Sequence, residues 1–315
     1  MYRIGVDLGG TNIVSAVIDE GYNIIGKARV ATNADRPAKA IFEDIAKTAF
    51  DAVKAADLTM DDVESIGIGT PGSVNKESGV IEYANNLNFD KVPAREMLNA
   101  LTGKDKIYID NDANCAALGE AVAGVGKGVR DLIAITLGTG VGAGIVVGGK
   151  LLTGCNYAGA ELGHTVIVYD GEPCTCGRKG CWEAYSSATA LIAQSKRAML
   201  ADPYTKMWDI AGTIDNVGGR TSFDAMRQGD PTATAVVKKY MSYLACGVTN
   251  LVNAFQPEIL CIGGGIGNEG EFLLKPLRRL VAAQRYSIHA EKQTQILPAK
   301  LGNDAGIIGA AMLDE

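Results

Sequence analysis

Short apolar runs separated by turn-forming residues dominate the first 110 positions of the chain. Runs of four to eight residues bounded by Gly, Asn or Asp favour strands, whereas apolar side chains spaced by three or four favour a helix. The first turn is Gly9-Gly10-Thr11-Asn12. We expect strands at 4–8, 13–18, 24–30, 65–69 and 106–110, a helix at 37–56 and an Ala-rich helix from Ala113. The pattern predicts an α/β domain that opens with a β-hairpin.

The same order of apolar runs and glycines returns in the middle of the chain. Residues 132–137 and 144–147 are predicted strands on either side of Gly138-Thr139-Gly140. We therefore infer an internal duplication, in which two similar α/β domains form a cleft whose glycine-rich tips can hold a polyphosphate. Later elements are expected as helices at 188–200 and 231–255 and a strand at 259–262.

The domain boundaries follow from this duplication. We expect a first domain at 1–112 and a second at 113–302. A C-terminal helix at about 303–315 is expected to pack back on the first domain. With 315 residues the chain is long enough for two domains, each with its own core.

Composition narrows the function classes. Hydrophobic residues make up 47% and charged residues 21%, as in a globular protein, and the net charge is −6 without any basic run. We therefore expect no nucleic-acid partner and no membrane association. An Asp at position 7 interrupts the N-terminal apolar run too early for a secretory signal, so a cytoplasmic location is expected. The 39 glycines occur in clusters, which indicates turns where backbone approaches a ligand.

The first turn carries a candidate phosphate site. Asp7 ends a strand and is followed by Gly9, Gly10, Thr11 and Asn12, so backbone N–H groups can face phosphate oxygens while the carboxylate holds hydrated Mg²⁺. A plain hairpin turn explains Gly-Gly about equally well. The matching turn at 138–140 and the triple glycine at 263–265 favour the phosphate site.

Two other glycine patterns are decoys. Residues 138–143 and 265–270 fit dinucleotide-binding fingerprints, but such a fingerprint needs a helix directly after the turn and an acidic residue downstream. A strand is predicted after Ala143, and Gly265 comes late in the chain without a βαβ unit. No P-loop sequence occurs, so neither fold is supported.

Three of the seven cysteines gather within eight residues. Cys174, Cys176 and Cys181 follow His164, one of two histidines in the chain. Three thiolates and an imidazole form a closed tetrahedral Zn²⁺ set, which is structural rather than catalytic. Reduced unliganded thiols or a redox pair are the alternatives. The sequence predicts one structural Zn²⁺ held by His164, Cys174, Cys176 and Cys181.

Taken together, six ordered motifs resemble the ROK family of repressors, open reading frames and sugar kinases, and most closely its bacterial glucokinases. They span nearly the whole chain and lie at 7–11, 69–72, 110–114, 137–142, 159–164 and 174–183. The resemblance implies the two-domain, actin-like ATPase fold, which is ribonuclease H-like and hexokinase-type. It also implies an ATP- and Mg²⁺-dependent transfer of phosphate to a hexose, with glucose as the expected substrate. Homodimers or higher homo-oligomers are implied by the resemblance alone.

The resemblance also implies roles for individual residues. Asp112 would be the general base, and sugar would be bound by Asn86, Asn111, Asp112, Glu161, His164 and Glu183. In the segment around Asn86, Phe89 replaces the usual Trp. The donor phosphates would face Asp7, Gly9, Gly10, Thr11 and Asn12, with Gly138, Thr139 and Gly140 closing over them and Gly264 and Gly265 near the adenosine. His164 would serve zinc and sugar through its two ring nitrogens.

The residues themselves leave some of these roles open. Asp112 lies at the start of a predicted helix, where an Asp is about as often an ordinary N-cap as a functional residue. Asp110 is the competing candidate for the base. We favour Asp112 because the last residue of a strand more often points into the structure. Glu161 and Glu183 are alternatively solvated surface residues.

Three rival functions remain. One is a kinase for mannose, fructose, N-acetylglucosamine or N-acetylmannosamine. Nothing in the sequence gives the volume of the sugar pocket, so these substrates cannot be distinguished from glucose on that basis. A second is a repressor of the same family, for which a preceding helix-turn-helix domain is expected and Asp7 leaves no room. The third is a sugar-sensing protein without turnover, which the presence of both Asp7 and Asp112 disfavours. ATP is the expected donor, although the sequence alone does not distinguish ATP from ADP or polyphosphate.

Overall fold

The computed structural model describes residues 1–313 and divides into two compact units. The first unit comprises 1–134, 144–160 and the chain from 299 onward, and the second comprises 135–143 and 161–298. Helix α3 (Asp112–Val122) therefore lies wholly in the first unit, whereas the boundary expected from the sequence, between residues 112 and 113, falls after the first residue of this helix. Of the expected C-terminal helix, residues 314–315 lie outside the described part.

Each of the two five-stranded sheets has the same strand order, which fits the duplication inferred from the sequence. The first sheet is ordered β3-β2-β1-β4-β8 and the second β11-β10-β9-β12-β13. β2–β3 and β10–β11 pair antiparallel, while β4–β8 and β12–β13 pair parallel. The first sheet consists of β1 (Tyr2–Leu8), β2 (Asn12–Ile18), β3 (Ile24–Ala31), β4 (Val63–Thr70) and β8 (Ile107–Asn111). The second consists of β9 (Leu132–Leu137), β10 (Val141–Val147), β11 (Lys150–Leu151), β12 (Ile259–Gly263) and β13 (Gln295–Pro298).

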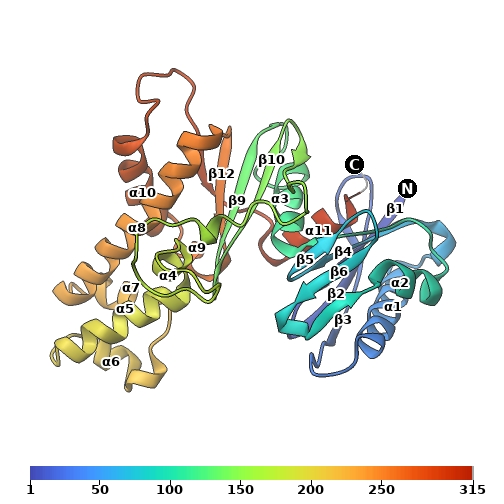
Figure 1. Cartoon of the computed structure of the whole chain (residues 1–315), viewed down its shortest axis with the longest axis horizontal. Coiled ribbons are helices and arrows are strands. Elements are labelled where there is room, and N and C mark those ends of the chain that lie inside the picture. Colours follow the sequence, from blue (N-terminus) through green and yellow to red (C-terminus); the bar gives the residue numbers. More distant parts are fainter. Residues whose placement is uncertain (314–315) are drawn as a thin grey trace. The chain divides into compact units, whose positions relative to one another are not determined.

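Helices cover both faces of the first sheet (Figure 1). On one face, Ile4, Val6 and Leu8 of β1 are fully buried in a core shared with α1 (Ala38–Ala55). On the other face, α11 (Ala305–Ala311) packs against β1, β4 and α3, so the end of the chain belongs to the first unit. The approach is close, because a Cβ built on Gly67 would lie 1.7 Å from the carbonyl oxygen of Ala310. The alternation of β1 therefore leaves Asp7 on the α11 side of the sheet.

A small third sheet in the first unit has no counterpart among the expected elements. It consists of β5 (Ser73–Asn75), β6 (Val80–Ala84) and β7 (Phe89–Val92). The 3₁₀ helix η2 (Asn85–Leu87) joins β6 to β7, and α2 (Ala94–Thr102) follows. These elements bring Asn86 to the surface near the first glycine turn.

The second unit is mostly helical. The longest helix, α8 (Pro231–Phe255), starts at Asp230, whose carboxylate accepts a 2.6 Å hydrogen bond from the N–H of Ala233. Trp182 is fully buried and packs against Gly247 of this helix. The other helices of the second unit are α4 (Glu183–Ser186), α5 (Ala188–Ala201), α6 (Met207–Ala211), α7 (Thr221–Arg227), α9 (Gly264–Gly267) and α10 (Glu271–Gln284). None of the helices within residues 1–313 combines the length and apolarity needed to span a membrane.

Candidate active site

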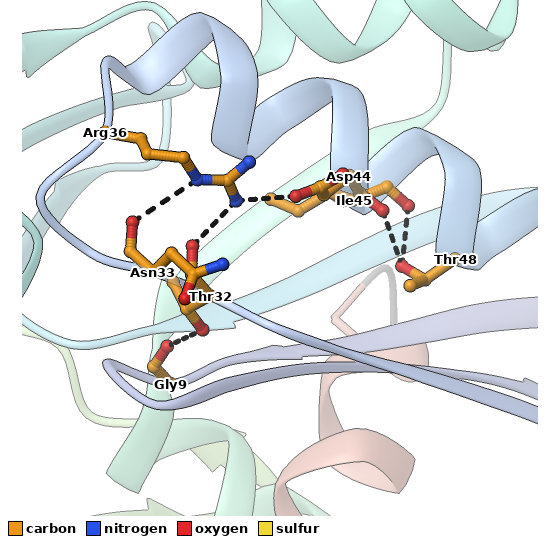
Figure 2. A network of polar contacts seen from close by, with 7 residues as sticks. All are labelled: Gly9, Thr32, Asn33, Arg36, Asp44, Ile45 and Thr48. Carbon is orange, nitrogen blue, oxygen red and sulfur yellow. Dashed lines mark hydrogen bonds and ion pairs between the residues drawn. The ribbon is translucent and has the colours of Figure 1, made fainter.

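A buried threonine holds the first glycine turn in shape. Thr32, which follows β3, donates from Oγ1 to the carbonyl oxygen of Gly9 at 2.6 Å and from its N–H to the carbonyl of Thr11 at 2.9 Å. Within the turn, the N–H of Gly9 reaches the carbonyl of Asn12 at 2.9 Å. The two bonds from Thr32 occupy two carbonyl groups of the turn, and Figure 2 shows Thr32 beside Gly9. The turn is therefore fixed from β3 rather than by its own residues alone.

A second layer ties Thr32 to helix α1 (Figure 2). Arg36 donates from Nη2 to the carbonyl of Thr32 at 2.8 Å, and the same nitrogen forms a 2.5 Å ion pair with Asp44 of α1. Thr48, one turn further along α1, is also buried and bonds to the carbonyls of Asp44 and Ile45. Nothing in the sequence pattern singled out Thr32, Arg36 or Asp44, because each is an ordinary polar residue of a loop or a helix.

Asp7 is half-buried at the end of β1, and its surroundings favour a bound cation. The pKa of Asp7 is raised to about 6, mainly by burial and also by the negative charge of Asp112, while the positive charge of Lys27 partly offsets this rise. A carboxylate that is desolvated and close to another carboxylate gains most from a divalent cation, and oxygen ligands of this kind suit Mg²⁺. The residues therefore fit the expected metal.

Asp110 and Asp112 have very different environments. Asp110 is 1% exposed, forms an ion pair with Lys76, and accepts hydrogen bonds from the N–H of Asn111 at 2.7 Å and from Asn114 Nδ2 at 2.9 Å. Asp112 is exposed, and Oδ1 accepts a 2.8 Å bond from the N–H of Ala113. Partial desolvation raises the pKa of Asp112, and that N–H lowers it. Asp110 is thus occupied by structural contacts, while Asp112 stays accessible.

The N-cap of α3 is Asn111 rather than Asp112. The Oδ1 of Asn111 accepts from the N–H groups of Ala113 at 2.9 Å and Asn114 at 3.4 Å. Its Nδ2 donates to the carbonyl of Gly72 at 3.1 Å, which links the cap to the turn after β4. The capping alternative for Asp112 is therefore wrong, because the neighbouring amide performs that task.

Asn86 lies beside the first glycine turn. A Cβ built on Gly10 would be 3.6 Å from the carbonyl oxygen of Asn86 and 3.7 Å from its Cβ. The side chain of Asn86 is exposed in η2. In the first unit, the structure thus brings Asn86 to the turn that follows Asp7, with Asp112 near enough to affect the pKa of Asp7.

In the second unit, the turn Gly138-Thr139-Gly140 joins β9 to β10 and is held by α5. The carbonyl of Gly138 accepts from the N–H of Ala188 at 2.8 Å, and that of Thr139 accepts from Thr189 Oγ1 at 2.8 Å. Gly264 starts α9 with a φ of +80°, and a Cβ there would lie 2.6 Å from the backbone nitrogen of Leu137. The structure therefore brings the second glycine turn close to the start of α9, as the resemblance implied for one nucleotide site.

Glu183 connects this turn to the cysteine cluster. Its Oε2 accepts a 2.9 Å hydrogen bond from the N–H of Val141, directly after Gly140. Its Oε1 lies 3.5 Å from Thr175 Oγ1 and 3.8 Å from Cys174 Sγ. The carboxylate of Glu183 thus has protein partners on both oxygens.

The four expected metal ligands meet in space. The ligand atoms of His164, Cys174, Cys176 and Cys181 all lie within 4.8 Å of one another. Cys176 Sγ and Cys181 Sγ are 3.6 Å apart, and Cys174 Sγ is 3.5 Å from His164 Nδ1. A tetrahedral Zn²⁺ with Zn–S near 2.3 Å and Zn–N near 2.1 Å places two sulfurs about 3.8 Å apart and a sulfur and nitrogen about 3.6 Å apart. The arrangement fits zinc through Nδ1, which leaves Nε2 of His164 for another partner.

Glu161 is exposed and immediately precedes the 3₁₀ helix η3 (Leu162–His164). Its carbonyl accepts the N–H of His164 at 3.1 Å, so the expected sugar residues Glu161 and His164 belong to one tight turn. Both are therefore positioned by the segment that also supplies the first metal ligand.

Comparison with known proteins places this chain among sugar kinases. The ROK family profile matches residues 3–315. The glucokinase of Streptomyces coelicolor is 37% identical over 313 residues, covering 98% of this chain and 96% of that protein. The glucokinase of Thermotoga maritima is also 37% identical, over 317 residues, with 98% and 96% covered. A crystal structure of a ROK family glucokinase from Streptomyces griseus with glucose and AMPPNP has a TM-score of 0.82 at 35% identity and covers 99% of both chains.

These similarities extend over nearly the full length of the chain, and they confirm the two-domain α/β fold of the actin-like ATPase type that the sequence motifs implied. The protein is a member of the ROK family.

Proposed function

We propose that this protein is an ATP-dependent hexose kinase that converts glucose to glucose 6-phosphate. The support is the near full-length similarity to bacterial glucokinases together with the environment of two carboxylates in the first unit. Asp7 ends the strand before the phosphate turn, and Asp112 is close enough to influence its pKa. A carboxylate for the metal-bound phosphates beside one for the sugar hydroxyl is what phosphoryl transfer to an alcohol requires.

The observation that carries the proposal is the contrast between Asp110 and Asp112. Asp110 is buried and paired with Lys76, while Asn111 caps the helix. Asp112 has neither task and keeps its carboxylate accessible. A residue without a structural task that is nonetheless partly desolvated, so that its pKa rises, fits the general base.

In the proposed reaction, Asp112 orients the 6-hydroxyl of glucose and accepts its proton as the oxygen attacks the terminal phosphorus of ATP. The bond from that phosphorus to the bridging oxygen breaks, and ADP leaves. Because the transition state is loose, the base needs to be well placed more than strongly basic. The turn Gly9-Gly10-Thr11-Asn12 presents N–H groups to the phosphates, except that of Gly9, which is bonded to the Asn12 carbonyl, and the rigidity of the turn comes from Thr32. Mg²⁺ held at Asp7 would neutralise charge on the phosphates.

Further roles for the sugar and the nucleotide are part of the proposal. Asn86 and Asn111 of the first unit, and Glu161, His164 and Glu183 of the second, are proposed as partners of the sugar hydroxyls. Carboxylates and amides in such a site reject sugars that lack a hydroxyl, because a buried polar group then loses its partner. Gly138, Thr139 and Gly140 are proposed for the phosphates, and Gly264 and Gly265 for the adenosine.

The zinc is proposed to be structural. Its four protein ligands leave no open position for catalysis. Bound zinc would fix the loop that carries His164 and, through Cys174 and Thr175, the carboxylate of Glu183.

We also propose that the protein acts as a homodimer or higher homo-oligomer.

A coupled assay of ADP release tests the proposed function. Glucose, mannose, fructose, N-acetylglucosamine and N-acetylmannosamine are compared at equal concentrations with ATP as the donor. ADP and polyphosphate release no ADP when they donate phosphate, so they are compared with ATP by the amount of sugar phosphate formed. The proposal expects the highest kcat/KM with glucose and ATP. A higher kcat/KM with an N-acetylamino sugar would replace the substrate, and sugar binding without turnover of any of them would make the protein a sensor.

A further inference from the structure

A cavity of about 660 Å³ in the first unit contains the phosphate turn and two cationic side chains that no role above includes. Its lining includes Asp7 and the turn itself, together with Lys27 and Arg29 of β3. Asn303 and Ile307, at the start of the C-terminal segment that packs on the sheet, close another side of it.

The register of the sheet explains why these cations reach the cavity. Asp7 pairs with Val14, and Val14 pairs with Arg29, so the three residues lie side by side across β1, β2 and β3. Lys27 lies two residues before Arg29 on the same strand. Directly paired residues and residues two apart project from the same face of a sheet. Lys27 and Arg29 therefore share the face of Asp7.

Both cations have partners that an anion can replace. Lys27 Nζ forms a 2.5 Å ion pair with Asp304, and the two side chains are 44% and 42% exposed. Such exposed pairs contribute little to stability. Arg29 Nε donates to Asn12 Oδ1 at 3.0 Å, which uses one of the five N–H donors of a guanidinium. Neither side chain is committed to the core of the fold.

The negative charge at this cavity also favours cationic side chains there. Asp7 and Asp112 are negative, and the charge of Asp112 already raises the pKa of Asp7. A polyphosphate brought to this turn would add several more negative charges. Lys27 acts on the same place, since it lowers the pKa of Asp7. Cations aimed at the transferred phosphate stabilise the charge of the transition state as well as binding.

We propose that Lys27 and Arg29 bind the terminal phosphates of the donor nucleotide, with Lys27 exchanging Asp304 for a phosphate oxygen when the nucleotide binds. This inference rests on the proposed function, because it assigns two further binding residues to the same phosphate turn. Arg29 bonds to Asn12 and so also orients the last residue of that turn. Asp304 competes with the nucleotide for Lys27.

The competition makes opposite predictions for the two partners of the ion pair. Lys27→Met removes a phosphate ligand, so the KM for ATP and the Kd for AMPPNP rise at least about tenfold, the loss of one charge-assisted hydrogen bond. Asp304→Asn removes the competitor, so both constants fall or stay unchanged. The KM for sugar stays within about twofold in each variant. Arg29→Met raises the KM for ATP like Lys27→Met.

Lys47→Met is the matched control, because Lys47 forms a similarly short exposed pair with Asp51 on α1, outside the cavity. It leaves both nucleotide constants unchanged. Equal effects of Lys27→Met and Asp304→Asn on nucleotide binding, or unchanged binding in Lys27→Met, would reduce the pair to a structural contact and overturn the inference. Calorimetric binding of Mg·AMPPNP keeps this test separate from the proposed function, since a wild type that phosphorylates no sugar refutes only the latter.

Discussion

The hydroxyl of Thr32 offers a test of how the phosphate turn is held. Thr32→Val keeps the shape of the side chain and removes the 2.6 Å hydrogen bond to the Gly9 carbonyl, while the backbone bond to Thr11 remains. Thr32 itself is fully buried, whereas Gly9 is half-buried. Leaving a buried acceptor without its donor costs about 1–3 kcal/mol, and partial access of water to Gly9 places the expected loss in unfolding free energy at about 1–2 kcal/mol.

Part of this loss should appear in nucleotide binding, because the freed carbonyl lets the turn change shape. We expect the KM for ATP to rise about three- to tenfold, since tenfold corresponds to about 1.4 kcal/mol. The KM for glucose should change much less. Thr32→Ser keeps the hydroxyl, so its KM for ATP should stay close to that of the wild type. Urea denaturation measures the stability, and the ADP-release assay measures both constants.

Thr48→Val separates a local effect from general destabilisation. Thr48 is also buried, with its Oγ1 2.8 Å from Ser15 Oγ and bonded to backbone carbonyls of α1, but it does not contact the turn. We expect a similar loss of stability with an unchanged KM for ATP. If both valine variants lose stability and neither changes the KM for ATP, Thr32 supports the fold only and the reasoning about the turn is wrong.

Three further predictions concern the metals and the second glycine turn. Purified protein should contain about one Zn²⁺ per chain, and Cys176→Ser should lose metal and thermal stability together; active protein without zinc would contradict this. The pKa of Asp7 is raised to about 6, so kcat/KM for ATP at limiting Mg²⁺ should increase as pH rises through about 6 and the carboxylate forms. The metal-free protein should lose stability as pH rises from about 4 through 6, because the folded state binds the proton of Asp7 more tightly than the unfolded state does. Asp7→Asn should remove both dependences, and unchanged profiles in this variant would refute the assignment. Gly264→Ala should destabilise by more than about 1 kcal/mol because of its φ of +80° and its contact with Leu137, whereas Gly265→Ala, with no atom within 4 Å of its Cβ, should be close to neutral in the same thermal melts.

The elements with regular periodicity were predictable from the sequence. The hairpin strands, α1, α8 and β12 occur close to the expected residues, because their apolar side chains repeat at the period of a strand or a helix. The strands β5 to β7 are only three to five residues long, too short to show a period. Helix α10 carries a readable helical pattern at Leu273, Leu274, Leu277 and Val281, but it was not among the expected elements.

The candidate site was predictable where its residues are adjacent in sequence. The glycine turns and the four metal ligands form short motifs, and the structure brings each set together. The support from Thr32 and Arg36 was not predictable, because their partners lie far away in the sequence or on another element. The sequence also could not decide which residue caps α3, since Asn and Asp cap equally well and only the geometry assigns Asn111.

The central claim is that Asp112 is the general base of a sugar kinase, and kcat of Asp112→Asn tests it most directly. Because Asn111 already caps the helix, the variant should fold, keep its zinc and bind ATP, while kcat falls by at least about a hundredfold, within the ~10²–10⁴ range expected for loss of a base. Asp110→Asn is the control: it disrupts the pair with Lys76, so it should lose stability with a milder effect on kcat. An Asp112→Asn enzyme that turns over normally, beside an inactive but folded Asp110→Asn enzyme, would contradict the account.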